Sequence, residues 1–166
     1  MATADNLKAA FAGESQANRK YLAFAKRAET DGFPQIAKLF RAAAEAETVH
    51  AHAHLRVMKG VGTTAENLQA AIAGEGHEAR EMYPAFLAEA EKEGNAAAAA
   101  SFRNALDVEK IHHNLYSEAA KVQAAGKDLP ARKVFVCSVC GNTVMDQAPD
   151  KCPVCKATKE KFFEVK

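Results

Sequence analysis

The sequence predicts an all-α domain of four helices, followed by a small β module that a metal ion holds together. Up to about Gly126 the chain is rich in alanine, and glycine and proline occur at only a few places. This helical part repeats itself once. All four cysteines lie in the last 30 residues, and a tail of about 34 residues is too short to be stable on an apolar core alone.

Stretches that contain glycine or proline divide the helical part into four predicted helices, which cover roughly residues 4–30, 35–59, 65–93 and 96–125. Thr64 and Asn95 are the expected N-caps of the third and fourth helices. Pro84 is expected to kink the third helix, because proline removes a backbone hydrogen bond.

The predicted domain organisation has three parts. Residues 1–126 form the helical domain, residues 127–132 form a linker, and residues 133–166 form the cysteine-containing module. Residues 133–136 predict a short β-strand at the start of that module.

The two halves of the helical part carry the same motifs. An Ala-Gly-Glu motif ends at Glu14 and again at Glu75, and a Glu-x-x-His motif ends at His50 and again at His112. The offset is 61 residues at the start and 62 afterwards. Each half is therefore expected to be a helical hairpin, and the fold to be two related hairpins.

Each predicted helix carries a glutamate in the middle of a stripe that is otherwise apolar. Four carboxylates inside one bundle would cost many kcal/mol if they were unpaired. A polar core of protonated carboxyl groups is the alternative, but it would not explain two histidines that each follow a glutamate by three residues. A pair of divalent cations explains all six groups, and this ligand set is typical of dinuclear sites in helical bundles. The candidate ligands are Glu14, Glu47, His50, Glu75, Glu109 and His112.

The ligand types narrow the choice of metal. Carboxylate oxygens with two imidazoles favour iron or manganese, and zinc is a possible occupant.

Glu78 is a further candidate ligand, for which a surface charge is the alternative. It follows Glu75 by three residues, so both lie on one helix face. The third helix has one residue more than the first between its motif glutamate and its tyrosine, and such an insertion often forms a π-bulge at a functional site. Because oxidation of two metal ions adds positive charge, we hypothesise that Glu78 and His50 exchange as ligands of one iron with its redox state.

Two tyrosines lie on the same helix faces as these glutamates. Either Tyr21 or Tyr83 could donate its hydroxyl group to a ligating carboxylate, and an ordinary core tyrosine is the alternative. His113 competes with its neighbour as a ligand, but the repeated motif favours His112.

The cysteines form two Cys-x-x-Cys pairs separated by eleven residues, namely Cys137 with Cys140 and Cys152 with Cys155. Two such pairs supply four thiolates in tetrahedral geometry, which suits either zinc or a single iron. Gly141 permits a tight backbone after the first pair, and a left-handed Lys156 at the matching place of the second pair is tolerable.

Charge and hydropathy exclude several classes of protein. The net charge is +1 and the sequence pI is about 7.7, so there is no basic stripe for nucleic acid. No apolar run reaches the roughly 18 residues that would span a membrane. No secretory signal is visible in the first residues, so we expect a cytoplasmic protein, in which clustered cysteines bind metal rather than form disulfides.

The chain resembles a rubrerythrin over nearly its whole length. The motifs that carry the resemblance lie at residues 12–17, 45–50, 81–84 and 109–112, and residues 136–155 resemble rubredoxin. The resemblance implies an all-α four-helix ferritin-like bundle with a small rubredoxin-like metal-bound β domain. Asn142, where rubredoxins often carry an aromatic residue, and Lys156 depart from the usual pattern, which bears on how the thiolate site is tuned.

The resemblance implies that the protein is a non-haem di-iron peroxidase. Two iron ions in the carboxylate site would supply the electrons that reduce hydrogen peroxide to water. One iron in the four-cysteine site would return electrons one at a time, from a redox-protein donor such as a rubredoxin or from an NAD(P)H-dependent reductase. In this role Glu78 and His50 exchange as ligands, and Tyr21 and Tyr83 orient ligands.

Chain geometry favours a homodimer, either swapped or head-to-tail. A helix of about 25 residues is about 38 Å long, whereas the connection at residues 59–64 reaches about 20 Å. It cannot cross one bundle from end to end. Either all neighbouring helices are antiparallel, or the hairpins exchange between subunits, which we favour. Each site would then take Glu14, Glu47 and His50 from one chain and the remaining ligands from the other.

Two other functions compete with the peroxidase. The first is a ferroxidase or iron-storage protein, and the fused thiolate site argues against it because storage needs no electron entry. The second is a non-enzymatic binding module with a structural zinc ribbon, and the carboxylate stripes argue against it.

Overall fold

The computed structural model describes residues 2–166, which divide into two compact units. The first unit ends at Gly62, and the second spans Thr63–Lys166. The division falls between the two repeats, so the second hairpin and the cysteine-containing module belong to one unit. The domain boundaries at residues 126 and 133 stay a prediction.

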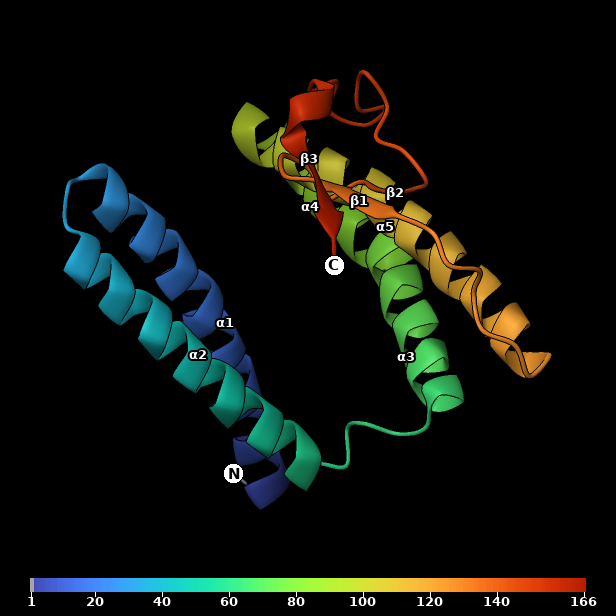
Figure 1. Ribbon diagram of the computed structural model, residues 1–166, viewed down its shortest axis with the longest axis horizontal. Coiled ribbons are helices and arrows are strands. Elements are labelled where there is room, and N and C mark those ends of the chain that lie inside the picture. Colours follow the sequence, from blue (N-terminus) through green and yellow to red (C-terminus); the bar gives the residue numbers. More distant parts are fainter. Residues whose placement is uncertain (1) are drawn as a thin grey trace. The chain divides into compact units, whose positions relative to one another are not determined.

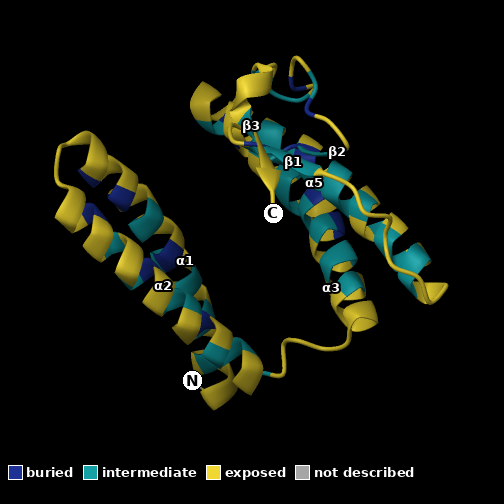
Figure 2. Ribbon diagram, in the orientation of Figure 1, coloured by how far each residue is buried: buried dark blue, intermediate teal, exposed yellow. Residues whose placement is uncertain are grey.

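Helices α1 (Thr3–Thr30) and α2 (Pro34–Val57) form the first unit as an antiparallel hairpin (Figure 1). Small residues make the contact between them, with Ala25, Ala28 and Ala37 buried beside Phe40. Figure 2 shows buried positions where the two helices face each other, while their outer faces are mostly exposed. Alanine at the contact lets two helices approach closely, and it leaves the larger apolar side chains partly uncovered.

Asn18 ties the two helices of this hairpin together. Its side-chain amide donates to the carbonyl oxygen of Ala44 at 2.7 Å and to Oγ1 of Thr48 at 2.8 Å. These bonds satisfy a buried polar side chain, which would otherwise destabilise the hairpin.

The second hairpin consists of α3 (Thr64–His77), a five-residue π-helix (Glu78–Met82), α4 (Tyr83–Lys92) and α5 (Ala96–Ala124). The π-helix confirms the predicted bulge at the place where this repeat has one extra residue. Pro84 is the second residue of α4, in its first turn. The wider π-turn before it gives the proline ring more room in the preceding turn, where proline cannot donate the usual backbone hydrogen bond.

The N-cap of α3 is Thr63, so the predicted cap at Thr64 is wrong by one residue. Oγ1 of Thr63 accepts a bond from the backbone N–H of Glu66 at 3.3 Å, and the Glu66 carboxylate accepts from the backbone N–H of Thr63 at 2.7 Å. This reciprocal capping box requires a three-residue spacing, which Thr63 has and Thr64 lacks. Asn95 is confirmed as the N-cap of α5, since its Oδ1 accepts from the N–H of Ala98 at 3.1 Å.

The sequence repeat is visible in the side-chain packing. Each hairpin holds one tyrosine and two phenylalanines whose ring centroids lie 5.6–6.3 Å apart, namely Tyr21, Phe24 and Phe40 in the first and Tyr83, Phe86 and Phe102 in the second. Each also holds an arginine–glutamate pair at 2.6 Å, Arg41 with Glu29 and Arg103 with Glu91. The two hairpins are therefore built on one plan.

The module contains strands β1 (Val134–Cys137), β2 (Thr143–Met145) and β3 (Phe162–Val165), paired antiparallel in the order β2-β1-β3. The first strand begins one residue later than predicted. The backbone after each cysteine pair is left-handed, with φ of 84° at Gly141 and 64° at Lys156, as the sequence indicated. No helix within residues 2–166 is both long and apolar enough to cross a bilayer.

Candidate metal centres

The first hairpin brings together Glu14 from α1 with Glu47 and His50 from α2. One ligand atom of each lies within 4.8 Å of the others. Glu47 and His50 share a face of α2 because they are three residues apart, and Nδ1 of His50 lies 2.9 Å from Oε2 of Glu47. The His50 side chain is 56% exposed, so this cluster lies at an open face of the hairpin.

The second hairpin repeats the arrangement with Glu75 from α3 and Glu109 and His112 from α5, again within 4.8 Å. Nδ1 of His112 lies 2.9 Å from Oε2 of Glu109 and 3.8 Å from Oε2 of Glu75. Burial, followed by the hydrogen bond that a protonated Glu75 donates to Glu109 and by the charges of Glu109 and Glu78, raises the pKa of Glu75 to about 8. Two carboxyl groups this close cannot both ionise easily unless a cation joins them.

A buried oxygen atom of Glu75 indicates that the second cluster suits a metal ion. Oε2 of Glu75 is buried, and no donor within residues 2–166 forms a hydrogen bond to it. A buried carboxylate oxygen without a donor is costly, and a bound cation supplies the missing partner. The oxygen and imidazole donors are those that iron and manganese accept.

Glu78 and Tyr83 lie beside this cluster without belonging to it. Burial and then the charge of Glu109 raise the pKa of Glu78. Burial followed by the charges of Glu109, Glu78 and Glu75 raises the pKa of Tyr83. The π-helix thus places both side chains within electrostatic reach of the second cluster. Tyr21 packs against Phe24 and Phe40 in the first hairpin.

The four cysteines lie together and form no disulfide. The Sγ atoms of Cys137 and Cys155 are 3.7 Å apart, and those of Cys140 and Cys152 are 3.6 Å apart. Metal–sulfur bonds of about 2.3 Å in a tetrahedron place the sulfur atoms about 3.8 Å apart, so the spacing suits a metal ion. Burial raises the pKa of Cys152, but hydrogen bonds from the backbone N–H groups of Cys155 and Val154 and from the thiols of Cys140 and Cys155 outweigh it and lower this pKa to about 7.

The structure also shows two side chains near these centres that the sequence did not single out as site residues. Oγ1 of Thr143 lies 3.0 Å from Nε2 of His112, and the amide of Asn142 lies 3.6 Å from Sγ of Cys152. The sequence indicated Asn142 only as a residue that replaces the aromatic side chain often found at this position in rubredoxins. No motif signals Thr143, because its contact joins residues far apart in the chain.

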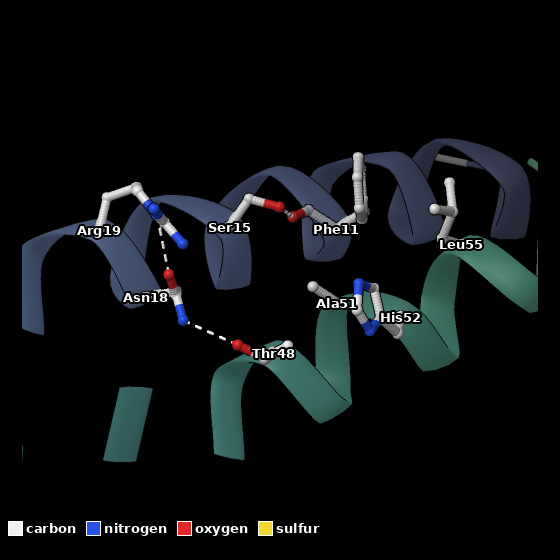
Figure 3. Close-up of a pocket in the computed structure, with 8 residues that line it drawn as sticks. All are labelled: Phe11, Ser15, Asn18, Arg19, Thr48, Ala51, His52 and Leu55. Carbon is white, nitrogen blue, oxygen red and sulfur yellow. Dashed lines mark hydrogen bonds between the residues drawn. The ribbon is translucent and has the colours of Figure 1, made fainter. Parts of the chain in front are cut away.

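A hollow of about 230 Å³ in the first hairpin is separate from these centres (Figure 3). Its walls include Phe11, Asn18, Thr48 and His52, and none of the three clustered ligands of this hairpin lines it.

His113, the alternative to His112 as a ligand, is half-buried but does not join the second cluster. The repeated Glu-x-x-His motif therefore selected the histidine that faces the carboxylates.

The fold and the clusters define a class of protein, a helical carboxylate metalloprotein with a thiolate module. The Rubrerythrin family matches residues 5–120, and the rubredoxin-like domain of rubrerythrins matches residues 135–163. The chain belongs to the rubrerythrin family. It has the four-helix ferritin-like and rubredoxin-like parts of that family, with a di-iron carboxylate site and a four-cysteine site. The rubredoxin-like domain implies electron transfer, and the family is one of oxidoreductases.

Relatives are similar over almost the full chain. Rubrerythrin-2 of Clostridium acetobutylicum is 38% identical, over 96% of this chain and 95% of its own. Two structures of nigerythrin, titled as its partially reduced state and its fully reduced, all-ferrous state, are each 34% identical. Both cover 99% of this chain and 87% of theirs, with a TM-score of 0.59.

Proposed function

We propose that the protein is a peroxidase that reduces hydrogen peroxide to water in defence against oxidative stress. The observation that supports this most is the combination, in one chain, of repeated carboxylate–imidazole clusters and a four-thiol site. Reduction of hydrogen peroxide to two water molecules consumes two electrons and two protons, and iron bound in the carboxylate site would supply the electrons. A protein that only stores iron has no need for a thiolate site.

We assign the metal-binding roles residue by residue. Carboxylates of Glu14, Glu47, Glu75 and Glu109 would hold and neutralise two iron ions, with His50 and His112 as nitrogen ligands. Four carboxylates balance two divalent ions, and a fifth, Glu78, becomes favourable when the ions are trivalent. Glu78 and His50 would therefore exchange with redox state. Crystal structures of the oxidised and reduced protein that showed the same ligands would contradict this exchange.

Tyr21 and Tyr83 are proposed to orient the ligating carboxylates. The charges of three carboxylates act on Tyr83, which supports this role for the second hairpin. Replacement by phenylalanine keeps the aromatic clusters and removes only the hydroxyl group. We expect Tyr83→Phe to slow peroxide reduction while the protein still binds two iron ions.

We propose that the complete di-iron site is assembled from two chains. Helix α2 has 24 residues and is about 36 Å long, whereas residues 58–63, which join it to α3, reach about 20 Å. So short a connection does not let α2 and α3 run parallel in one bundle. Exchange of hairpins in a homodimer resolves this, with Glu14, Glu47 and His50 from one chain and Glu75, Glu78, Glu109 and His112 from its partner.

Electrons would enter through one iron held by Cys137, Cys140, Cys152 and Cys155. The donor would be another redox protein, such as a rubredoxin, or an NAD(P)H-dependent reductase. A reducing compartment keeps four such thiols available for metal, so we place the protein in the cytoplasm.

Anaerobic stopped-flow spectroscopy tests the peroxidase function. Fully reduced, iron-loaded protein is mixed with hydrogen peroxide, and the ferric–thiolate absorption of the four-cysteine site is followed. We expect rapid reoxidation by peroxide and slow reoxidation by oxygen. Faster reoxidation by oxygen than by peroxide would indicate a ferroxidase. A four-cysteine site that holds zinc and shows no visible absorption would indicate a binding module.

A further inference from the structure

His112 is held on both sides of its ring, unlike its counterpart His50. Nδ1 of His112 faces Glu109 at 2.9 Å, and Nε2 faces Oγ1 of Thr143 at 3.0 Å. The side chain is 26% exposed. His50 makes the same Nδ1 contact with Glu47, but within residues 2–166 its Nε2 has no hydrogen-bond partner.

The second bond of Thr143 sets the direction of its bond to His112. Its hydroxyl donates to the carbonyl oxygen of Gly141 at 3.2 Å. A hydroxyl group has one proton, so its oxygen accepts from the Nε2–H of His112. A neutral imidazole with its proton on Nε2 has its lone pair on Nδ1, the nitrogen that faces the carboxylates.

The contact that holds His112 comes from the cysteine-containing module. Thr143 begins β2 and pairs with Val136 of β1. Gly141 lies against the same helix, since a Cβ atom at Gly141 would be 3.7 Å from Cγ1 of Val108. Val108 and His112 are four residues apart on α5, so the module rests on one helix face at two successive turns.

The surroundings offer the Nε2–H group few other polar partners. His112 and Thr143 line a hollow of about 360 Å³ whose other walls are mainly apolar, among them Leu68, Leu115 and Met145. Loss of the hydroxyl would leave the imidazole N–H without its protein acceptor, and an unsatisfied donor in such a place is costly.

We propose that Thr143 is a positioning residue, which sets His112 with Nδ1 as its metal-binding nitrogen through the bond from Nε2–H to its hydroxyl. Docking of the rubredoxin-like module on α5 thereby prepares a ligand of the carboxylate site. His112 becomes the stationary imidazole of that site, and His50, which has no such bond, is left free to move. The identity of Nδ1 as a ligand rests on the proposed function, whereas the bond to Thr143 does not.

Nuclear magnetic resonance of histidine-labelled, zinc-loaded protein tests this role. Long-range proton–nitrogen spectra show which ring nitrogen carries the proton, and they also report the exchange of that proton with water. Thr143→Val keeps the side-chain shape and the strand pairing but removes the hydroxyl. Thr143→Ser keeps the hydroxyl, and His50 serves as a control in each sample.

In the wild type and in Thr143→Ser, the Nε2–H proton of His112 is expected to exchange slowly. In Thr143→Val it should exchange at least about tenfold faster, and zinc should bind the carboxylate site about ten- to hundredfold more weakly. The signals of His50 should not change. Equal exchange in Thr143→Val and wild type would overturn the role of Thr143.

The two hypotheses fail in different ways. If zinc leaves the Nδ1 signal of His112 unchanged in the wild type, the metal site of the proposed function is contradicted. The exchange of Nε2–H still decides whether Thr143 holds the ring.

Discussion

The side-chain amide of Asn142 donates to Sγ of Cys152 across 3.6 Å, inside the rubredoxin-like module. Asn142 is only 1% exposed, and Cys152 is fully buried. Hydrogen bonds to the sulfur atoms of an iron–thiolate site raise its reduction potential, because they stabilise the more negative reduced state. The residue that departs from the rubredoxin pattern thus donates to one of the four sulfur atoms of this site.

Asn142→Leu should lower the reduction potential of the four-cysteine iron by about 20–60 mV, since a hydrogen bond contributes about 0.5–1.5 kcal/mol and one electron corresponds to 59 mV per tenfold change. Spectroelectrochemical titration of the iron-loaded protein measures it. Val139→Ala, at an exposed position between two of the cysteines, is the control and should leave the potential unchanged. An unchanged potential in Asn142→Leu would show that the bond does not tune the site.

The raised pKa of Glu75 predicts that the metal-free protein loses stability as the pH rises. The folded-state pKa is about 8 against an ordinary value of 4.5, so the folded chain binds more protons than the unfolded chain between these values. The free energy of unfolding therefore falls from about pH 5 to about pH 8. Urea unfolding of metal-free protein across this range measures the slope.

Glu75→Gln should reduce this slope, because the amide does not titrate. Bound metal should reduce it too, since the cation replaces the proton between Glu75 and Glu109. A slope that is the same in wild type and Glu75→Gln would contradict the assignment.

The positions of the helices and of the clustered ligands could be predicted because they depend on local patterns. Glutamates inside apolar stripes and histidines three residues after two of them identified the groups that the structure brings together. The extra residue before Tyr83 predicted the π-helix in the same way. The N-cap lies at Thr63, one residue before the expected position, because Thr63 has the three-residue spacing to Glu66 that a capping box requires.

The contact of Thr143 with His112 could not be predicted, because it depends on how the module docks on α5. The hydrogen bond of Asn142 likewise depends on the fold of the tail, which the sequence indicates only through its cysteines. Local patterns identify residues with a chemical role, and tertiary structure decides what supports them.

Removal of metal from the four-cysteine site should unfold the rubredoxin-like module and leave the helices intact. Three strands of three or four residues supply little core, so most of the folding free energy of the module comes from the metal. Hydrogen exchange before and after chelation measures it, and readdition of iron or zinc should restore protection of β1. Protection that persists without metal would contradict this account.

The repeated aromatic clusters are expected to contribute similarly to the free energy of unfolding. Phe40→Ala and Phe102→Ala each remove one of the three rings that contact one another in a cluster. Each should lower the free energy of unfolding by about 2–4 kcal/mol, somewhat less than for a fully buried ring. Chemical denaturation measures both variants, and a negligible cost for either would show that its cluster does not stabilise the hairpin.

The composition of the di-iron site is tested most directly by a mixed dimer. One chain carries Glu14→Gln with Glu47→Gln, the other carries Glu75→Gln with Glu109→Gln, and two affinity tags isolate the dimer that contains both. Exchange of hairpins puts both damaged clusters in one site and both intact clusters in the other. We therefore predict about half of the wild-type di-iron content and peroxide reduction in the mixed dimer, since one of its two sites is complete, and almost none in either variant alone. A mixed dimer as inactive as its parents, with its four-cysteine iron retained, would contradict a site shared between chains.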